Sequence, residues 1–275
     1  MRYLKLNVIF SYIALIISSI FFILPILWML LQSFKNAKDT IAIPPKIFFS
    51  PTFSNYIKVL KNDYFWEATL DSIIVSFMSV SAALAIGIPF AYALTRFSFK
   101  GKNEIAHFIL STKMLPGIVI AIPLVQTFNY INLLDTHIGV SIAHILLMLA
   151  VIVWVMRAFL QNLPIDLEEA ALIDGASRLK IIWSIVLPIA RPGIVTVTAL
   201  SFLFSWNDLF FGLTLASFDV VPLPIYLTTE YIGYLAVNWG ELSAAGLLAT
   251  LPIILIVILL RENLIRGLSM GAIKG

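Results

Sequence analysis

The 275-residue chain carries charged side chains at only 12% of its positions, whereas 60% are hydrophobic and 13% are aromatic. A water-soluble domain usually has about 25% charged residues, so this composition excludes an ordinary soluble protein. The net charge of +3 follows the ends of apolar segments, which excludes a nucleic-acid-binding surface as its origin. Because the chain has no cysteine, disulfides, thiol catalysis and thiolate metal sites are also excluded.

The first apolar segment is free of charge from Leu6 to Phe34. A signal-peptide core has about 7–15 residues and is followed by a small-residue cleavage site. This run is longer and lacks such a site, so we expect a retained membrane span.

Five further apolar segments follow along the chain. A helix needs about 20 mostly apolar residues to cross the hydrocarbon layer. The segments that meet this criterion predict an all-α integral membrane protein with six spans: Val8–Leu31, Ala68–Thr95, Ile105–Asn129, His137–Met156, Gly193–Ser217 and Leu242–Leu260. In the second span, Ser79, Ala83, Gly87 and Ala91 recur every four residues and predict a smooth ridge for close helix packing.

The distribution of Lys and Arg predicts the orientation of these spans. Of the 18 basic residues, one, Lys113, lies within a span, and we expect it to extend toward the cytoplasmic interface. The predicted outer loops hold only Lys35, Lys38, Lys46, Lys58 and Lys61, and the other basic residues fall on the opposite side. We therefore expect both termini in the cytoplasm.

The longest predicted cytoplasmic connection contains a short helix. Asp166 and Glu169 have capping-box spacing, and acidic residues favour a helix N-terminus. Gly175 suits the left-handed residue that ends a helix. A helix of about three turns is marginal alone, so it either packs on its own bundle as an ordinary connector or docks on a partner.

The residues downstream of this helix favour docking. Glu169-Ala170-Ala171, then Gly175, Ile185 and Leu187-Pro188, follow the spacing EAA, three residues, G, nine residues, I, one residue, LP. This pattern resembles the cytoplasmic EAA loop of permease subunits in binding-protein-dependent ABC importers.

The resemblance covers most of the chain. Phe204-Ser205-Trp206-Asn207-Asp208 and the tail 267–275 are similar to the carbohydrate-uptake branch, in particular to the shorter, six-span permease of maltose-type pairs. It implies a type I ABC importer permease fold. We expect a first span and outer loop over residues 1–67, a permease core over 68–266 with the EAA loop at about 164–188, and a cytoplasmic tail over 267–275.

The same resemblance implies the roles of particular residues. The loop forms a coupling helix seated in a cleft of an ATPase subunit, with Glu169 facing a basic group there. The implied coupling residues are Glu168, Glu169, Ala170, Ala171, Asp174 and Gly175, supported by the framework residues Asp166, Ile185, Leu187 and Pro188. In maltose-type relatives the tail reaches toward the ATPase dimer, which implies contacts by Gly271, Lys274 and Gly275.

The expected partners follow from the same family and from what the chain lacks. The sequence has no G-x-x-x-x-G-K-[ST] motif to hold ATP phosphates. We expect no cofactor on this chain, with ATP and Mg²⁺ at partner ATPase subunits. A second permease subunit in a heterodimer, an ATPase dimer, an extracytoplasmic solute-binding protein and the lipid bilayer of the cell membrane complete the expected assembly, without nucleic acid.

The fifth span carries the candidate solute contacts: Phe204, Trp206, Asn207 and Asp208. An acid deep in a span usually faces the bundle or a watery cavity, and carboxylates bind sugar hydroxyls while aromatic rings stack on sugars. Two interpretations stay open, a lining of the solute pathway and a gate or packing contact at the outer interface.

Three functions remain to be separated. The first is an ABC permease for a sugar or oligosaccharide, or for a related solute such as glycerol phosphate. The second is an ion-coupled secondary carrier, which predicts paired acids or histidines within spans, whereas the charges here are expected to be unpaired. The third is a scaffold subunit without a transport path. Isolation of the complex with ATPase subunits distinguishes the first from the others.

Overall fold

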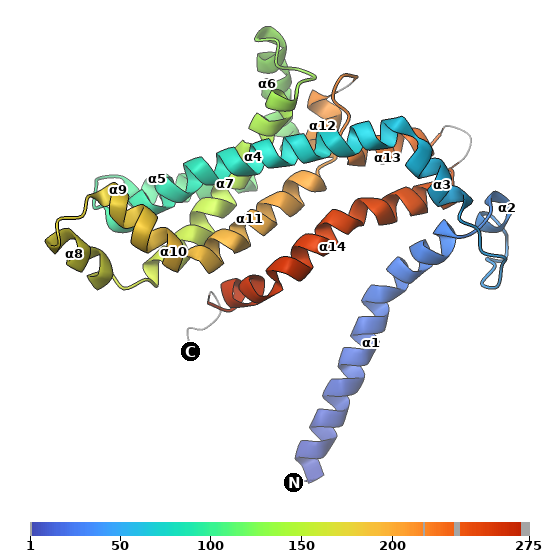
Figure 1. The fold of residues 1–275 in the computed structure, drawn as a ribbon, viewed down its shortest axis with the longest axis horizontal. Helices are drawn as coiled ribbons and strands as arrows, with labels where there is room; N and C mark the ends of the chain where they lie inside the picture. Colours follow the sequence, from blue (N-terminus) through green and yellow to red (C-terminus); the bar gives the residue numbers. More distant parts are fainter. Residues whose placement is uncertain (1, 217, 234–236, 271–275) are drawn as a thin grey trace. The chain divides into compact units, whose positions relative to one another are not determined.

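The computed structural model of the chain describes residues 2–216, 218–233 and 237–270, which are almost entirely helical. Among them, four continuous helices are long and apolar enough to cross a membrane: α1 (Arg2–Ser33), α4 (Asp63–Arg96), α7 (His137–Gln161) and α14 (Trp239–Met270) (Figure 1). Within these ranges the only β pairing is the isolated bridge between Ile232 and Val237. The first, second, fourth and sixth predicted spans, and the all-α membrane fold, are confirmed.

The third predicted span is bent rather than straight. Helix α5 (Lys102–Ser111) continues into a short 3₁₀ turn, η1 (Thr112–Met114), and then meets α6 (Gly117–Tyr130) at an angle of 95°. The break falls at Pro116, which has no backbone N–H to continue the helix and disfavours helical geometry in the residue before it. The predicted span over Ile105–Asn129 is therefore present as a bent pair of helices.

The fifth predicted span is also divided. Helix α11 (Arg191–Trp206) is bent by 77° from the preceding segment Arg178–Ile189, and α12 (Phe210–Leu215) is separate. Residues 207–209, which were expected to continue the helix as far as Ser217, form the break instead. If each bent pair counts as one span, the described residues supply up to six.

The structure divides into two compact units, of which the first combines residues 1–66 with 227–251. It contains α1, α2 (Ala37–Thr40) and α3 (Ser54–Lys61). The Asn55 amide donates to the carbonyls of Ser33 and Lys35, both at 2.8 Å, and so satisfies backbone groups at the end of α1. The Lys35 ammonium is buried over the Trp28 ring, 4.6 Å from its centroid.

The second unit, residues 67–226 and 252–275, holds the packed helices that matter for the site. On α4 the predicted ridge of Ser79, Ala83, Gly87 and Ala91 is buried. A Cβ at Gly87 would lie 2.7 Å from Ile152 of α7, so the ridge admits α7 at close range. The prediction of close helix packing is confirmed, and this chain's own α7 covers the ridge.

At one end of the second unit, two aspartate carboxylates accept hydrogen bonds from the backbone of the segment before α13. Asp135 accepts hydrogen bonds from the backbone N–H groups of Phe218 and Asp219, both at 2.9 Å. Asp71 accepts from Val221 N at 2.8 Å and lies 2.8 Å from His137 Nε2. These contacts hold the connection between α12 and α13 (Leu223–Tyr231) against the third turn of α4 and the start of α7.

Candidate functional site

The helix predicted to couple to a partner is present as α8 (Asp166–Ile173). Its C-terminus closes with two backbone bonds, Gly175 N–H to Leu172 O at 3.0 Å and Ala176 N–H to Ala171 O at 2.9 Å. This is the Schellman arrangement, and Gly175 adopts φ +80° as it requires. The predicted glycine cap is confirmed.

The predicted cap at the other end of α8 is wrong. The N-cap residue is Ile165, without a side-chain cap, and Asp166 is the first helical residue rather than the cap. Asp166, Glu168 and Glu169 nevertheless all lie in the first turn, where negative charge is favourable.

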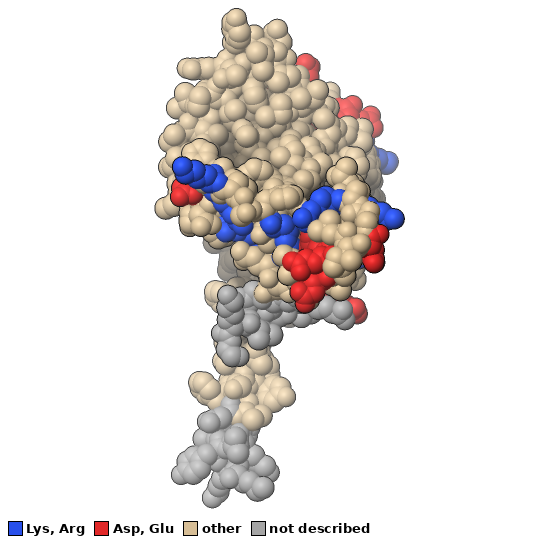
Figure 2. Space-filling model, turned by 90° about the vertical axis from the view of Figure 1, so that its left-hand side faces the viewer, with Lys and Arg blue, Asp and Glu red and all other residues tan. Residues whose placement is uncertain are grey.

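Two neighbouring acids of α8 have opposite surroundings. Glu168 is buried, and its oxygens accept hydrogen bonds from Arg96 Nε at 2.6 Å and Tyr92 OH at 2.7 Å. Glu169 and Ala170 are exposed, whereas Ala171 is half-buried against an apolar cluster between the helices. Figure 2 shows acidic and basic side chains gathered on the side of the molecule where α8 lies in Figure 1.

The rest of the connection forms a compact support for α8. After α9 (Arg178–Ile181) the chain makes a π-helical turn, η2 (Ile182–Val186), and continues into α10 (Leu187–Ile189). The Leu187 N–H reaches back to Ile182 O, and Ile185 packs on the same apolar cluster as Ala171. Pro188 is exposed, and so is Asp174, the C-cap residue of α8.

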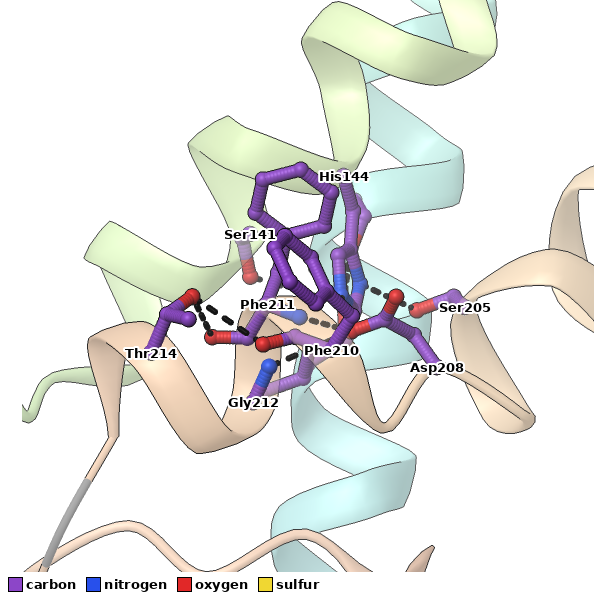
Figure 3. Close-up of polar contacts among 10 residues, drawn as sticks. Ser141, His144, Ser205, Asp208, Phe210, Phe211, Gly212 and Thr214 are labelled. Atoms are coloured by element: carbon purple, nitrogen blue, oxygen red, sulfur yellow. Dashed lines mark hydrogen bonds and ion pairs between the residues drawn. The ribbon is translucent and has the colours of Figure 1, made fainter. Parts of the chain in front are cut away.

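A second group of polar residues surrounds the break after α11 (Figure 3). The Asp208 carboxylate accepts hydrogen bonds from the N–H groups of Phe211 at 2.9 Å and Gly212 at 3.1 Å, and so caps α12. His144 of α7 is buried, with Nε2 3.2 Å from Asp208 Oδ2 and Nδ1 2.9 Å from Ser205 Oγ. The expectation of unpaired intramembrane charges is therefore wrong, because Asp208 and His144 are neighbours in space.

The bend between η1 and α6 lies next to the break between α11 and α12. The Lys113 ammonium, in η1, lies 4.8 Å from the centroid of the Phe204 ring in α11. A Cβ at Gly117, the first residue of α6, would lie 3.1 Å from the Phe210 ring at the start of α12. A cation and aromatic rings therefore lie close to the ends of the two helices that Asp208 separates, α11 and α12.

The remaining predicted pathway residues differ in accessibility. Asn207 is exposed, and its amide donates to Leu203 O at 2.8 Å. Trp206 is buried and stacked on Phe202, with ring centroids 5.4 Å apart, so in this conformation its ring has no free face for a sugar. The predicted tail contacts Gly271, Lys274 and Gly275 lie outside the described residues.

Sequence reasoning missed three residues of these sites, Tyr92, Arg96 and His144. Arg96 is one of the basic residues that predict the orientation, and His144 has no metal-ligating or acidic residue near it in the sequence. Spacing along the second span was the one available signal, since Tyr92 and Arg96 are four residues apart and so share a helix face.

Comparison with known proteins gives concordant matches. Residues 83–270 match the family described as "Binding-protein-dependent transport system inner membrane component". The trehalose transport system permease protein SugB of Mycobacterium tuberculosis is 32% identical over 259 residues, covering 92% of this chain and 93% of SugB. The trehalose/maltose transport system permease protein MalG of Thermococcus litoralis is 30% identical over 268 residues, covering 96% and 95%.

Solved structures give the same fold. A chain of a bacterial ABC transporter involved in the import of the acidic polysaccharide alginate superposes with a TM-score of 0.81 at 23% identity, covering 95% of this chain and 98% of that chain.

Proposed function

The chain belongs to the family of inner membrane components of binding-protein-dependent transport systems, and from this premise we propose its specific task. It translocates a sugar or oligosaccharide delivered by an extracytoplasmic binding protein. Separate ATPase subunits drive it through α8, and the chain itself hydrolyses nothing. A second, non-identical permease subunit supplies the other half of the pathway.

The exposure pattern of α8 carries this proposal. Glu168 and Ala171 turn toward the bundle, while Glu169 and Ala170 are exposed. An eight-residue helix anchored on one side presents a small, acidic surface on the other. Such a surface fits a cleft with a basic group, since the alanine permits close approach and the carboxylate supplies the complementary charge.

We place the solute pathway where the bend between η1 and α6 lies next to the break between α11 and α12. Transporters commonly bind solutes where discontinuous helices meet within the membrane. Here Asn207 is exposed and Asp208 retains an oxygen, Oδ1, for which no hydrogen bond is recorded among the described residues. Lys113 adds a positive charge beside Phe204, which also suits a solute with an acidic group.

The structure and the family bear on two alternatives, an ion-coupled carrier and a permease for a related solute. The His144–Asp208 pair is a feature that an ion-coupled carrier also predicts, so charge pairing no longer separates the two classes. Family membership does separate them, because the family to which this chain belongs consists of permease subunits of ABC importers. A related solute such as glycerol phosphate remains the second candidate, favoured by Lys113.

A charge reversal at Glu169 tests the docking surface. In Glu169→Lys we expect the tagged permease to insert in the membrane but to lose most of its co-purifying ATPase subunit. Glu104→Lys, the same reversal at an exposed acid in the first turn of α5, is the matched control. Equal ATPase recovery from both variants would remove the docking role.

Uptake assays test the solute class. Cells with and without the gene are given labelled trehalose, maltose, alginate oligosaccharide and glycerol 3-phosphate in turn. The proposal predicts gene-dependent uptake of at least one saccharide. Uptake of glycerol 3-phosphate alone would assign the second candidate instead.

A further inference from the structure

The buried acid of α8 has both of its oxygens engaged by one helix. Glu168 Oε1 accepts from Arg96 Nε at 2.6 Å, and Oε2 accepts from Tyr92 OH at 2.7 Å. The side chains of Arg96 and Glu168 are only 8% and 3% exposed. Tyr92 and Arg96 are one turn apart at the end of α4, so the carboxylate is hydrogen-bonded to two successive turns of that helix.

The same arginine also reaches the chain between α7 and α8. Arg96 Nη2 donates to Leu163 O at 3.1 Å. The guanidinium thus joins the end of α4, the exit of α7 and the first turn of α8 at one place. The other described contacts of α8 with the bundle are apolar and involve Ala171 and Leu172. Apolar contacts would allow α8 to slide against its neighbours, whereas the paired hydrogen bonds of Glu168 fix its orientation.

The charges of this cluster have little access to water. Removal of one partner from a buried ion pair leaves an uncompensated charge, which is strongly destabilising, whereas removal of both partners together is far less so. The pair therefore resists separation when a force acts on α8.

We propose that Glu168 is a positioning residue that makes α8 and the adjoining end of α4 move as one body. The inference rests on the proposed docking of α8 to an ATPase. The ATPase contacts α8 at Glu169, so its movement displaces α8. The hydrogen bonds of Glu168 then make α4 move with α8, and α4 is long enough to span the membrane. Two adjacent acids therefore have different roles: Glu169 binds the partner, and Glu168 links α8 to α4.

Paired spin labels measure this directly. The chain has no cysteine of its own, so a Ser98→Cys, Ile173→Cys pair is labelled specifically. Both positions are exposed, one just beyond α4 and the other at the end of α8. The distance between labels is recorded in the intact transport complex in lipid nanodiscs, without nucleotide and after trapping with ATP and vanadate.

The expected result is one narrow distance that is the same in both states. In Glu168→Gln, and to a smaller degree in Tyr92→Phe, we expect the distribution of distances to widen or shift on trapping. The Glu168→Gln, Arg96→Gln double variant controls for folding, because neither charge is then left unpaired; it should assemble well yet show the same loss of rigid coupling.

Two outcomes would overturn the inference: a distance that changes on trapping in the parent protein, or a Glu168→Gln distribution identical to the parent. Failure of any ATPase to co-purify with the parent would instead count against the proposed function.

Discussion

Glu168 and Glu169 are chemically identical, yet one is buried against α4 and the other is exposed. Successive residues of a helix point about 100° apart at 3.6 residues per turn, so only one of two adjacent acids can face a given neighbour. Glu168 is the one that faces α4, where Arg96 and Tyr92 donate hydrogen bonds to it. The assignment of roles within the EAA sequence therefore depends on which face of α8 lies against α4.

Asp208 offers a prediction at the same scale. Its carboxylate caps α12, and loss of a side-chain cap costs about 0.5–2 kcal/mol. We expect Asp208→Ala to lower the thermal unfolding midpoint of the purified permease complex, while Asp208→Asn, which keeps an acceptor oxygen, retains most of the stability. A midpoint in Asp208→Ala equal to that of the parent would show that the cap contributes nothing.

Contacts between side chains of different helices could not be predicted from the sequence. Glu168 meets Tyr92 and Arg96 across separations of 76 and 72 residues, and His144 meets Asp208 across 64. Spacing rules describe neighbours within one helix, whereas these contacts depend on how helices pack. The local signal at Gly175 was sufficient because positive φ at a helix end is a property of a few consecutive residues.

At the scale of elements, the ends of α8 determine how it is presented. Gly175 permits the chain to turn immediately after the helix, and an added Cβ there meets no atom within 4 Å. Any effect of substitution therefore comes from the backbone, since a left-handed conformation costs an ordinary L-residue about 1–2 kcal/mol.

Substitutions at Gly175 should follow this backbone preference. We expect Asn, which tolerates positive φ, to be accepted, Ala to be intermediate, and Val to be worst because its branched Cβ adds strain. The measurement is ATPase recovery with the tagged permease together with its thermal stability. If Val and Asn behave alike, the capping account of α8 is incorrect.

The bent spans show what a hydropathy criterion misses. Apolar content over about 20 residues located the third and fifth spans, but a sum over a window does not register a break within it. Pro116 and the Asn207-Asp208 pair were visible as helix-ending residues. Such residues do not rule out a span, because breaks in a helix are tolerated within the membrane where other parts of the protein cover them.

At the scale of the whole molecule, composition was the strongest guide. A chain with so few charges must bury its backbone polar groups in helices if it is to cross lipid, and that constraint predicts both the fold class and the number of apolar segments. Orientation rests on the distribution of Lys and Arg, and the docking of α8 requires that the α8 end face the cytoplasm.

Site-directed crosslinking from α8 tests the central claim most directly. Ala170 is exposed on α8, and Phe218 is exposed in the connection between α12 and α13, so each position can be replaced by cysteine for labelling. With a bifunctional thiol–amine reagent in membranes, the account predicts a crosslink between Ala170→Cys and a nucleotide-binding ATPase subunit, and none from Phe218→Cys. A crosslink only from Phe218→Cys, or modification of Ala170→Cys by an impermeant reagent added outside the cell, would contradict it.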